Sequence, residues 1–439
     1  MSMKSKQRIT SLGMAARWSM IGGAWSLLAA ASCGQDVKEP PTASDAGEAG
    51  AGSVQGGAAS GGGTGMAGTQ DEGGSASGGQ LGGGNAGGGG GNEGGDAGAG
   101  AEGGSGPASA AFLYASSLLS GIQHASVDPQ SGALTPLSSS PAAAGHLYNI
   151  AATDRFLFTA ENDAKRVHVH PIAEDGTLPD SPSSSIELAG EPVSLALDLS
   201  GRFAFVATSS DESIHVLDVD QSTGALSASL EPLELTGAPA VVAVAPHGDH
   251  VYVTRLAAPG ILGFALDPTT GQLTELEGSP FGADVVIAGA LVFSPKGPFL
   301  FASGSGVSSF RIEESGALST VKGSPFFEDV AADYFATNLA IEPTGRFLYA
   351  SAYLTTDQIT GFAIEPAAGD LTLLPSDPIS VPAPYSIAIS PNGRFLYAAS
   401  DFEGIYGYAI DPQTGALSEL ASSPLDVTGL QRQLAFVQR

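Results

Sequence analysis

The chain has 439 residues, and its 45 acidic residues against 17 Lys and Arg give a formal net charge of −28. Residues 108–439 alone hold 36 acidic and 12 basic residues, a net charge of −24. An excess this large opposes contact with phosphate backbones, so we expect no nucleic-acid partner for this part of the chain.

The first 33 residues are predicted to be a lipoprotein signal segment. An apolar stretch rich in Ala and Leu runs from Trp18 to Ser32, and it follows the basic residues Lys4, Lys6, Arg8 and Arg17. This order is typical of a secretory signal, and the stretch is too short for an ordinary spanning helix. The segment from Ala30 to Cys33 resembles the lipobox of bacterial lipoproteins, which implies lipidation of Cys33 and the membrane as a partner through that lipid. In the alternative, ordinary cleavage leaves Cys33 an incidental residue.

Residues 34–107 are predicted to be a disordered linker. Positions 41–107 contain 29 of the 61 glycines and no aromatic residue. Such a stretch buries too little apolar surface to offset the entropy lost on ordering. We therefore expect one folded domain, residues 108–439.

Within that domain, the motif Gly-x-Leu followed by Thr, Ser or Pro occurs seven times between Gly132 and Leu417. Each copy belongs to a unit of strand-like segments separated by turn residues, such as Asp411–Gly415 in the last unit. The second strands of the units are predicted to start at Phe112, Phe156, Phe203, Val251, Phe299, Phe347 and Phe395. A period in the forties built from β segments is typical of a propeller blade with four strands. The predicted fold class is therefore all-β, a seven-bladed β-propeller.

The two ends of the repeat region complete one blade. The region begins with a second strand at Phe112 and ends with residues 434–437, which match a first strand. We expect this C-terminal strand to join three N-terminal strands, which closes the ring and leaves no exposed sheet edge.

The repeated strand pairs also carry a family resemblance. Gly-Arg-Phe-Leu-Tyr-Ala occurs at 345–350 and 393–398, followed by Gly-Phe-Ala and Asp-Pro-x-x-Gly-x-Leu elements. These motifs resemble those of the lactonase-type seven-bladed propellers, which include 6-phosphogluconolactonase-like enzymes. The resemblance spans residues 112–437 and implies the propeller fold, with hydrolysis of a lactone ring as the implied activity.

Alignment of the units predicts which residues stand where the inner strands begin: Val193, Ala240, Gly289, Thr337, Tyr385, Arg432 and His146. Tyr385, Arg432 and His146 belong to three consecutive blades across the ring closure. We expect His146 to act as a base toward water, Arg432 to bind the acyl oxygen or a substrate carboxylate, and Tyr385 to orient the ring. In the alternative, His146 is a polar loop residue and Arg432 pairs with a surface acid such as Asp426.

Other polar residues of the long loops, Glu161, Arg255 and Asp333, are weaker candidates for ligand binding. His168 and His170 share one face of a predicted strand, but no third ligand is evident, so no metal is expected. Calcium binding is an alternative to a merely solubilising acidic surface, although no Asp-x-[Asp/Asn]-x-[Asp/Asn]-Gly run is present. No cofactor is predicted.

Three functions remain open from the sequence. The first is a monomeric, exported protein, lipid-anchored to the bacterial cell envelope, whose propeller outside the cytoplasm binds a small molecule or an envelope protein. The second is a secreted lactonase. The third is a wall-facing or matrix scaffold with no discrete ligand.

Overall fold

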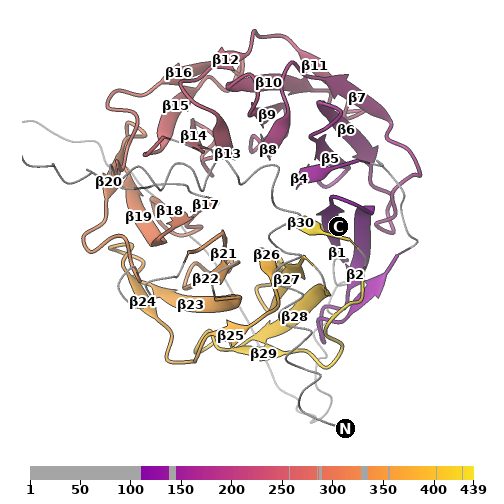
Figure 1. Cartoon of the computed structure of the whole chain (residues 1–439), viewed down its shortest axis with the longest axis vertical. Helices are drawn as coiled ribbons and strands as arrows, with labels where there is room; N and C mark the ends of the chain where they lie inside the picture. The colour runs from indigo at the N-terminus through magenta and orange to yellow at the C-terminus, as the bar shows by residue number, and fades with distance from the viewer. Residues whose placement is uncertain are drawn as a thin grey trace, which may run out of the picture. The chain divides into compact units, whose positions relative to one another are not determined.

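The computed structural model describes residues 110–137, 145–256, 258–283, 285, 289–327, 335–353, 356–401, 403–427 and 429–439. Cys33 and the predicted segments 1–33 and 34–107 lie outside these residues. In the described part, seven antiparallel sheets stand around a common axis (Figure 1). The predicted seven-bladed all-β propeller is confirmed. No helix in the described residues is long and apolar enough to cross a membrane.

Each blade has four strands in the same order from the axis outward. The innermost strands are β30 (Gln431–Gln438), β4 (Leu147–Ala152), β8 (Pro192–Leu197), β13 (Pro239–Val244), β17 (Leu291–Phe293), β21 (Asn338–Ile341) and β26 (Pro384–Ile389). The second strands are β1 (Ala111–Ser117), β5 (Phe156–Glu161), β9 (Phe203–Thr208), β14 (His250–Arg255), β18 (Phe299–Gly304), β22 (Phe347–Ala352) and β27 (Phe395–Ser400).

The third strands are β2 (Gly121–Val127), β6 (Arg166–Pro171), β10 (Ser213–Val219), β15 (Leu262–Leu266), β19 (Gly306–Ile312), β23 (Gln358–Ile364) and β28 (Gly404–Ile410). The outer strands are β3 (Leu134–Pro136), β7 (Ser184–Glu187), β11 (Leu226–Ala228), β16 (Leu273–Glu275), β20 (Leu318–Thr320), β24 (Leu371–Leu373) and β29 (Leu417–Glu419). Two short strands, β12 (Leu233–Glu234) and β25 (Ile379–Ser380), pair with β10 and β23. We number the blades from the first (β1–β3 with β30) to the seventh (β26–β29).

The second strands form the buried middle of the ring. In six of the seven blades every residue of this strand is buried, because each sheet packs its two faces against two neighbouring sheets. A strand buried on both faces needs apolar residues in succession rather than alternation, and runs such as Phe-Ala-Phe-Val-Ala in β9 supply them. The hydrophobic core is therefore a series of clusters between adjacent blades.

The ring closes as the sequence predicted. β30 pairs antiparallel with β1, with Leu434 opposite Ala115 and Val437 opposite Phe112. Backbone hydrogen bonding continues to the last residue, since the amide of Arg439 donates to the carbonyl of Ala110 at 2.8 Å. The edge of β1 is thereby covered by a strand from the opposite end of the chain.

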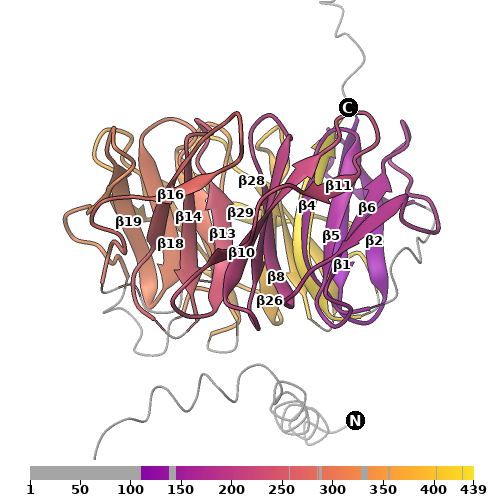
Figure 2. The same ribbon diagram turned by 90° about the horizontal axis from the view of Figure 1, so that it is seen from above.

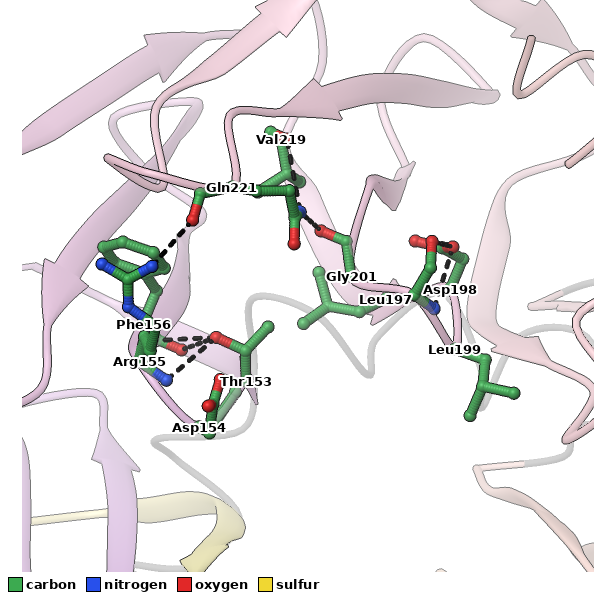
Figure 3. A pocket seen from close by; sticks show the side chains of 12 residues that line it. Thr153, Asp154, Arg155, Phe156, Leu197, Asp198, Leu199, Gly201, Val219 and Gln221 are labelled. Carbon is green, nitrogen blue, oxygen red and sulfur yellow. Dashed lines mark hydrogen bonds between the residues drawn. The ribbon is translucent and has the colours of Figure 1, made fainter. Parts of the chain in front are cut away.

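The repeated sequence motifs join adjacent blades through a recurring contact that we call the latch. In it, an aromatic ring at the start of a second strand packs against the turn glycine of the next blade, and side-chain donors bind carbonyls of that turn. Phe156 in the second blade packs against Gly224 of the third, where φ is +73° and an added Cβ would collide with the Phe156 ring. Arg155 lies over the same ring at 5.2 Å and donates to the carbonyl of Gln221 in the neighbouring turn (Figure 3). It also donates to the carbonyl of Ser222 in that turn. In four other blade pairs a buried Tyr hydroxyl donates to the carbonyl of the equivalent Gly at 2.7 Å, from Tyr114, Tyr252, Tyr349 and Tyr397.

The fourth blade departs from the predicted register by one residue. His250, not Val251, packs against Gly316 as Phe156 packs against Gly224, and it also begins β14. The sequence alignment missed this because a histidine stands at a position that is aromatic and apolar in the other blades.

The strands run along the ring axis, so the connections fall on two faces (Figure 2). The short-turn face carries the turns from first to second strand and from third to outer strand, such as residues 153–155 and 220–224. The long-loop face carries the loops from second to third strand and those between blades, such as residues 162–165 and 188–191.

Candidate functional site

Five of the seven inner strands begin with a β-bulge or a similar irregularity at the long-loop face. The strand pairing skips one residue between Leu147 and Asn149, and skips residues at the same place in β8, β13 and β26. A similar irregularity in β30 includes Arg432. A bulge turns a side chain out of the regular alternation, and bulges are common next to active sites. The residues at these bulges are Tyr148, Val193, Ala240, Tyr385 and Arg432.

Three of these residues are polar, and they come from the seventh, first and second blades. Their strands β26, β30 and β4 are neighbours around the axis (Figure 1). The equivalent residues of the third and fourth blades, Val193 and Ala240, are small and apolar. The polar residues at these bulges therefore lie across the ring closure, with Tyr148 at the position that the sequence alignment assigned to His146.

Arg432 is held firmly at this position. Its Nη1 donates to Oδ1 of Asp401 at 2.6 Å, and its guanidinium lies 4.2 Å from the centre of the Tyr385 ring. The Asp401 side chain is 2% exposed and the Arg432 side chain 13%. Arg432 therefore pairs with Asp401, not with Asp426. A carboxylate and an aromatic ring together fix the plane of the guanidinium.

A second tyrosine completes the support of Arg432. The hydroxyl of Tyr353 donates to Oδ2 of Asp401 at 2.7 Å, so the two carboxylate oxygens serve two different donors. The ring of Tyr353 packs edge-on against Tyr385 with centroids 5.5 Å apart. Tyr353 follows β22 and Asp401 follows β27, which is the same repeat position in two adjacent blades. We call Tyr353, Tyr385, Asp401 and Arg432 the arginine cluster.

The phenols of the cluster remain hydrogen-bond donors. Burial raises the pKa of Tyr385, and this effect outweighs the opposing influence of the Arg432 charge. Burial also raises the pKa of Tyr353, with a further contribution from the negative charge of Asp401. Both hydroxyls therefore keep their protons throughout the physiological pH range.

His146 precedes β4, the inner strand next to β30, but it stands in a different register from the one predicted. Its carbonyl accepts the amide of Asn162 just as the carbonyl of Ala383 accepts the amide of Asp401. His146 thus corresponds to Ala383, and Tyr148 corresponds to Tyr385. The shortened turn between β4 and β5 shifted the sequence alignment by two residues.

The imidazole of His146 is oriented by a carboxylate. Its Nδ1 lies 2.6 Å from Oδ2 of Asp163, and the two side chains are 45% and 61% exposed. With the Nδ1 proton donated to Asp163, a neutral ring has its lone pair on Nε2. In that tautomer Nε2 of His146 is a hydrogen-bond acceptor on a side chain that solvent can reach.

Glu161 packs against the segment that carries His146. It ends β5 and is 8% exposed, and its Oε2 lies 2.6 Å from Nε2 of His168. An added Cβ on Gly145 would collide with the Glu161 carboxylate, so that carboxylate packs directly against this segment. Glu161 thus supports the loop of His146 from inside the second blade.

Arg255 lies apart from this group, in the fourth blade. Arg255 is buried and donates to the carbonyls of Thr236 and Pro259 at 2.9 and 3.0 Å, which ties two loops of the fourth blade together. Asp333 lies outside the described residues. Within the described ranges, no group of three or more His, Cys, Asp or Glu residues is placed to hold a metal ion.

Sequence reasoning missed Asp401, Tyr353, Asp163 and Tyr148. A repeat-position signal was available for two of them, because Tyr353 and Asp401 both directly follow a predicted second strand. Asp163 and Tyr148 had no comparable signal, since their roles depend on the local register of β4.

Comparison with known proteins places this geometry in context. The family profile described as "Lactonase, 7-bladed beta-propeller" matches residues 195–322 and 290–429. A putative 6-phosphogluconolactonase from Bacteroides fragilis is 22% identical, with 75% of this chain and 98% of that chain covered and a TM-score of 0.63. The periplasmic gluconolactonase of Pseudomonas aeruginosa is 23% identical, with 75% and 99% covered and a TM-score of 0.61. No curated protein matches the chain significantly.

Proposed function

Because the chain belongs to the lactonase family of seven-bladed β-propellers, we propose that it hydrolyses a sugar-derived lactone at the long-loop face of its seventh, first and second blades. The observation that carries the proposal is the arginine cluster, in which a buried carboxylate and two tyrosines hold Arg432 at a bulge. Such fixed donors suit the charge that develops on a carbonyl oxygen.

In this reaction the hydrogen-bond donors bind the carbonyl oxygen of the lactone, and the proton acceptor activates water. Arg432 and the Tyr385 hydroxyl donate to the carbonyl oxygen of the lactone. Nε2 of His146 takes a proton from water while the water oxygen forms a bond to the carbonyl carbon. As the ring carbon–oxygen bond breaks, the imidazolium returns the proton to the leaving oxygen and the product is a hydroxy acid. Asp163 keeps the imidazole in the required tautomer.

The test measures the hydrolysis of sugar lactones by the full chain, with the released acid monitored by pH-stat titration. We expect His146→Gln to lower kcat about 100-fold or more, the usual value of a general base. Arg432→Lys keeps the charge next to Asp401 but loses the planar fork, and we expect a fall of about 100-fold in kcat/KM. Arg166→Lys is the matched control, because Arg166 forms only an exposed surface pair with Glu187.

The outcomes separate the candidate functions. Turnover that is unchanged in His146→Gln and Arg432→Lys contradicts the proposed site. A lactone that binds the intact chain without turnover, and fails to bind Arg432→Lys, favours a binding protein over an enzyme.

We also propose that the protein is exported and anchored to the cell envelope through a lipid on Cys33. The support is the order of charge, apolar stretch and lipobox-like residues from Lys4 to Cys33. Expression of the full chain in a bacterial host, followed by detergent phase partition, tests it. The intact chain should enter the detergent phase and Cys33→Ser the aqueous phase, with Ser53→Ala as a control. An intact chain that stays aqueous refutes the anchor.

A further inference from the structure

On the short-turn face, a cavity lies between the fourth and fifth blades. Its volume is about 660 Å³, against about 280 Å³ for the depression between the second and third blades. It is lined by the β13–β14 turn, the β17–β18 turn and residues 311–315. It lies on the opposite face from the arginine cluster and does not depend on the proposed lactone chemistry.

The repeats show what normally occupies this place. In four blades an arginine precedes the second strand, lies over the ring that begins it at 5.1 to 5.4 Å, and donates to turn carbonyls of the next blade. The four are Arg155, Arg202, Arg346 and Arg394. Figure 3 shows Arg155 in this position, over Phe156 and directed at Gln221. In these four blades a guanidinium therefore occupies the space between the turn before the second strand and the facing turn of the next blade. We call this space the slot.

In the fourth blade the slot has no arginine. The equivalent pair is Asp249 and His250, and Oδ1 of Asp249 lies 2.9 Å from Nδ1 of His250. Asp249 therefore turns back toward its own blade instead of reaching the fifth. Among the described residues, no hydrogen bond engages the carbonyls of Glu314 and Ser315, the second and third residues of the facing turn.

Two other blades also lack this arginine, and in each another arginine contacts either the facing blade or the ring. In the first blade, Arg439 donates to the carbonyl of Ile172, just before the turn of the second blade. In the fifth blade, Arg311 lies over the ring of Phe299 at 5.8 Å. In the fourth blade, by contrast, no arginine of the described residues lies over the ring of His250 or donates to the facing turn, although Arg311 of the fifth blade is part of the cavity wall.

The walls of the open slot favour a cation. The carboxylates of Asp249, Glu313 and Glu314 line the cavity, and Arg311 already lies against Phe299. The apolar side chains of Phe293 and Ile312 provide a surface for the methylene stem of a long basic side chain. A guanidinium entering the slot would find an aromatic ring, turn carbonyls and carboxylates, which are the groups it prefers.

We propose that this slot binds an arginine side chain of a partner polypeptide, which completes from outside the latch that the other blades complete from within. The chemistry is that of the four internal arginines: stacking on the ring of His250 and donation to the carbonyls of Glu314 and Ser315. The carboxylates add an attraction that salt weakens.

The test uses the full chain and a blocked Gly-Arg-Gly peptide, with binding followed by ligand-observed NMR. We expect saturable binding that weakens at least ten-fold when citrulline, an uncharged isostere, replaces arginine. Asp249→Arg combined with His250→Phe rebuilds the internal latch and should abolish binding. Arg155→Ala opens an equivalent slot between the second and third blades and should add a second equivalent of bound peptide.

Several results overturn the proposal. One is the absence of binding by the intact chain at about 10 mM peptide, well above the millimolar constant expected for one side chain. Another is equal binding of the citrulline peptide. A third is retention of binding by the rebuilt latch, with a circular dichroism spectrum and melting temperature that show a folded protein.

Discussion

His170 makes the free energy of unfolding depend on pH. This residue lies on β6, is 0% exposed, and has no described partner for its Nδ1. Burial lowers its pKa from 6.5 to about 4, with a smaller contribution from the neighbouring His168. The folded protein thus keeps His170 neutral at pH values where the unfolded chain is already protonated.

The sign and size of the effect follow from this difference. Between pH 6.5 and about pH 4 the unfolded state binds more protons, so the free energy of unfolding falls as the pH is lowered. The full difference in pKa corresponds to about 3 kcal/mol, a large fraction of the 5–15 kcal/mol typical of a domain. Above pH 6.5 the stabilisation is fully present.

The assay is urea denaturation of the full chain at several pH values between about 7.5 and 4.5, followed by far-UV circular dichroism. His170→Leu removes the titrating group and should flatten the dependence by up to about 3 kcal/mol. His170→Gln tests the same loss of titration with a polar side chain. His247→Gln, an exposed histidine, is the control and should leave the slope unchanged.

If the unfolding free energies of the intact chain and of both His170 variants changed equally with pH, this reasoning would be refuted. Some dependence on pH should remain in the variants, because burial also lowers the pKa of His124, which lies between the first and second blades. The contribution of His170 is therefore the difference between the pH dependence of the unfolding free energy of the intact chain and that of the His170 variants.

Three further predictions concern closure, packing and the site. Tyr397→Phe leaves the buried carbonyl of Gly132 without its donor and should cost about 1–2 kcal/mol of unfolding free energy in urea melts; an unchanged midpoint would contradict this. Deletion of Gln431–Gln438 should expose the edge of β1 and give aggregates on size exclusion, whereas a monomer with the original melting temperature would show that closure is dispensable. Asp401→Asn should release Arg432 and lower kcat/KM for a lactone about 100-fold. The surface variant Asp426→Asn should leave kcat/KM unchanged. An equal kcat/KM for Asp401→Asn and the intact chain would show that Asp401 does not position Arg432.

The fold was predictable because the repeat encodes it several times. The Gly-x-Leu turns, the apolar second strands and the orphan strand at 434–437 are separate signals that agree. Where a unit replaced a typical residue, as at His250, the alignment slipped by one position. The slip did not affect the fold, because neighbouring units fixed the number of blades.

The site was predictable only in part. Tyr385 and Arg432 were recognised as neighbours because they occupy one repeat position in consecutive blades. Their partners Asp401 and Tyr353 also share one repeat position, directly after a second strand, but periodicity does not show that a loop residue at this position turns toward Arg432. The shortened turn in the second blade likewise hid the correspondence of Tyr148 to Tyr385.

The pairing of β30 with β1 also sets the order of events during synthesis. β30 is synthesised after every other strand of the ring, so the three early strands of the first blade keep an unpaired edge until it emerges. The native ring therefore cannot close before β30 has left the ribosome, and every nascent or prematurely terminated product that lacks β30 keeps an unpaired strand that chaperones and proteases can recognise.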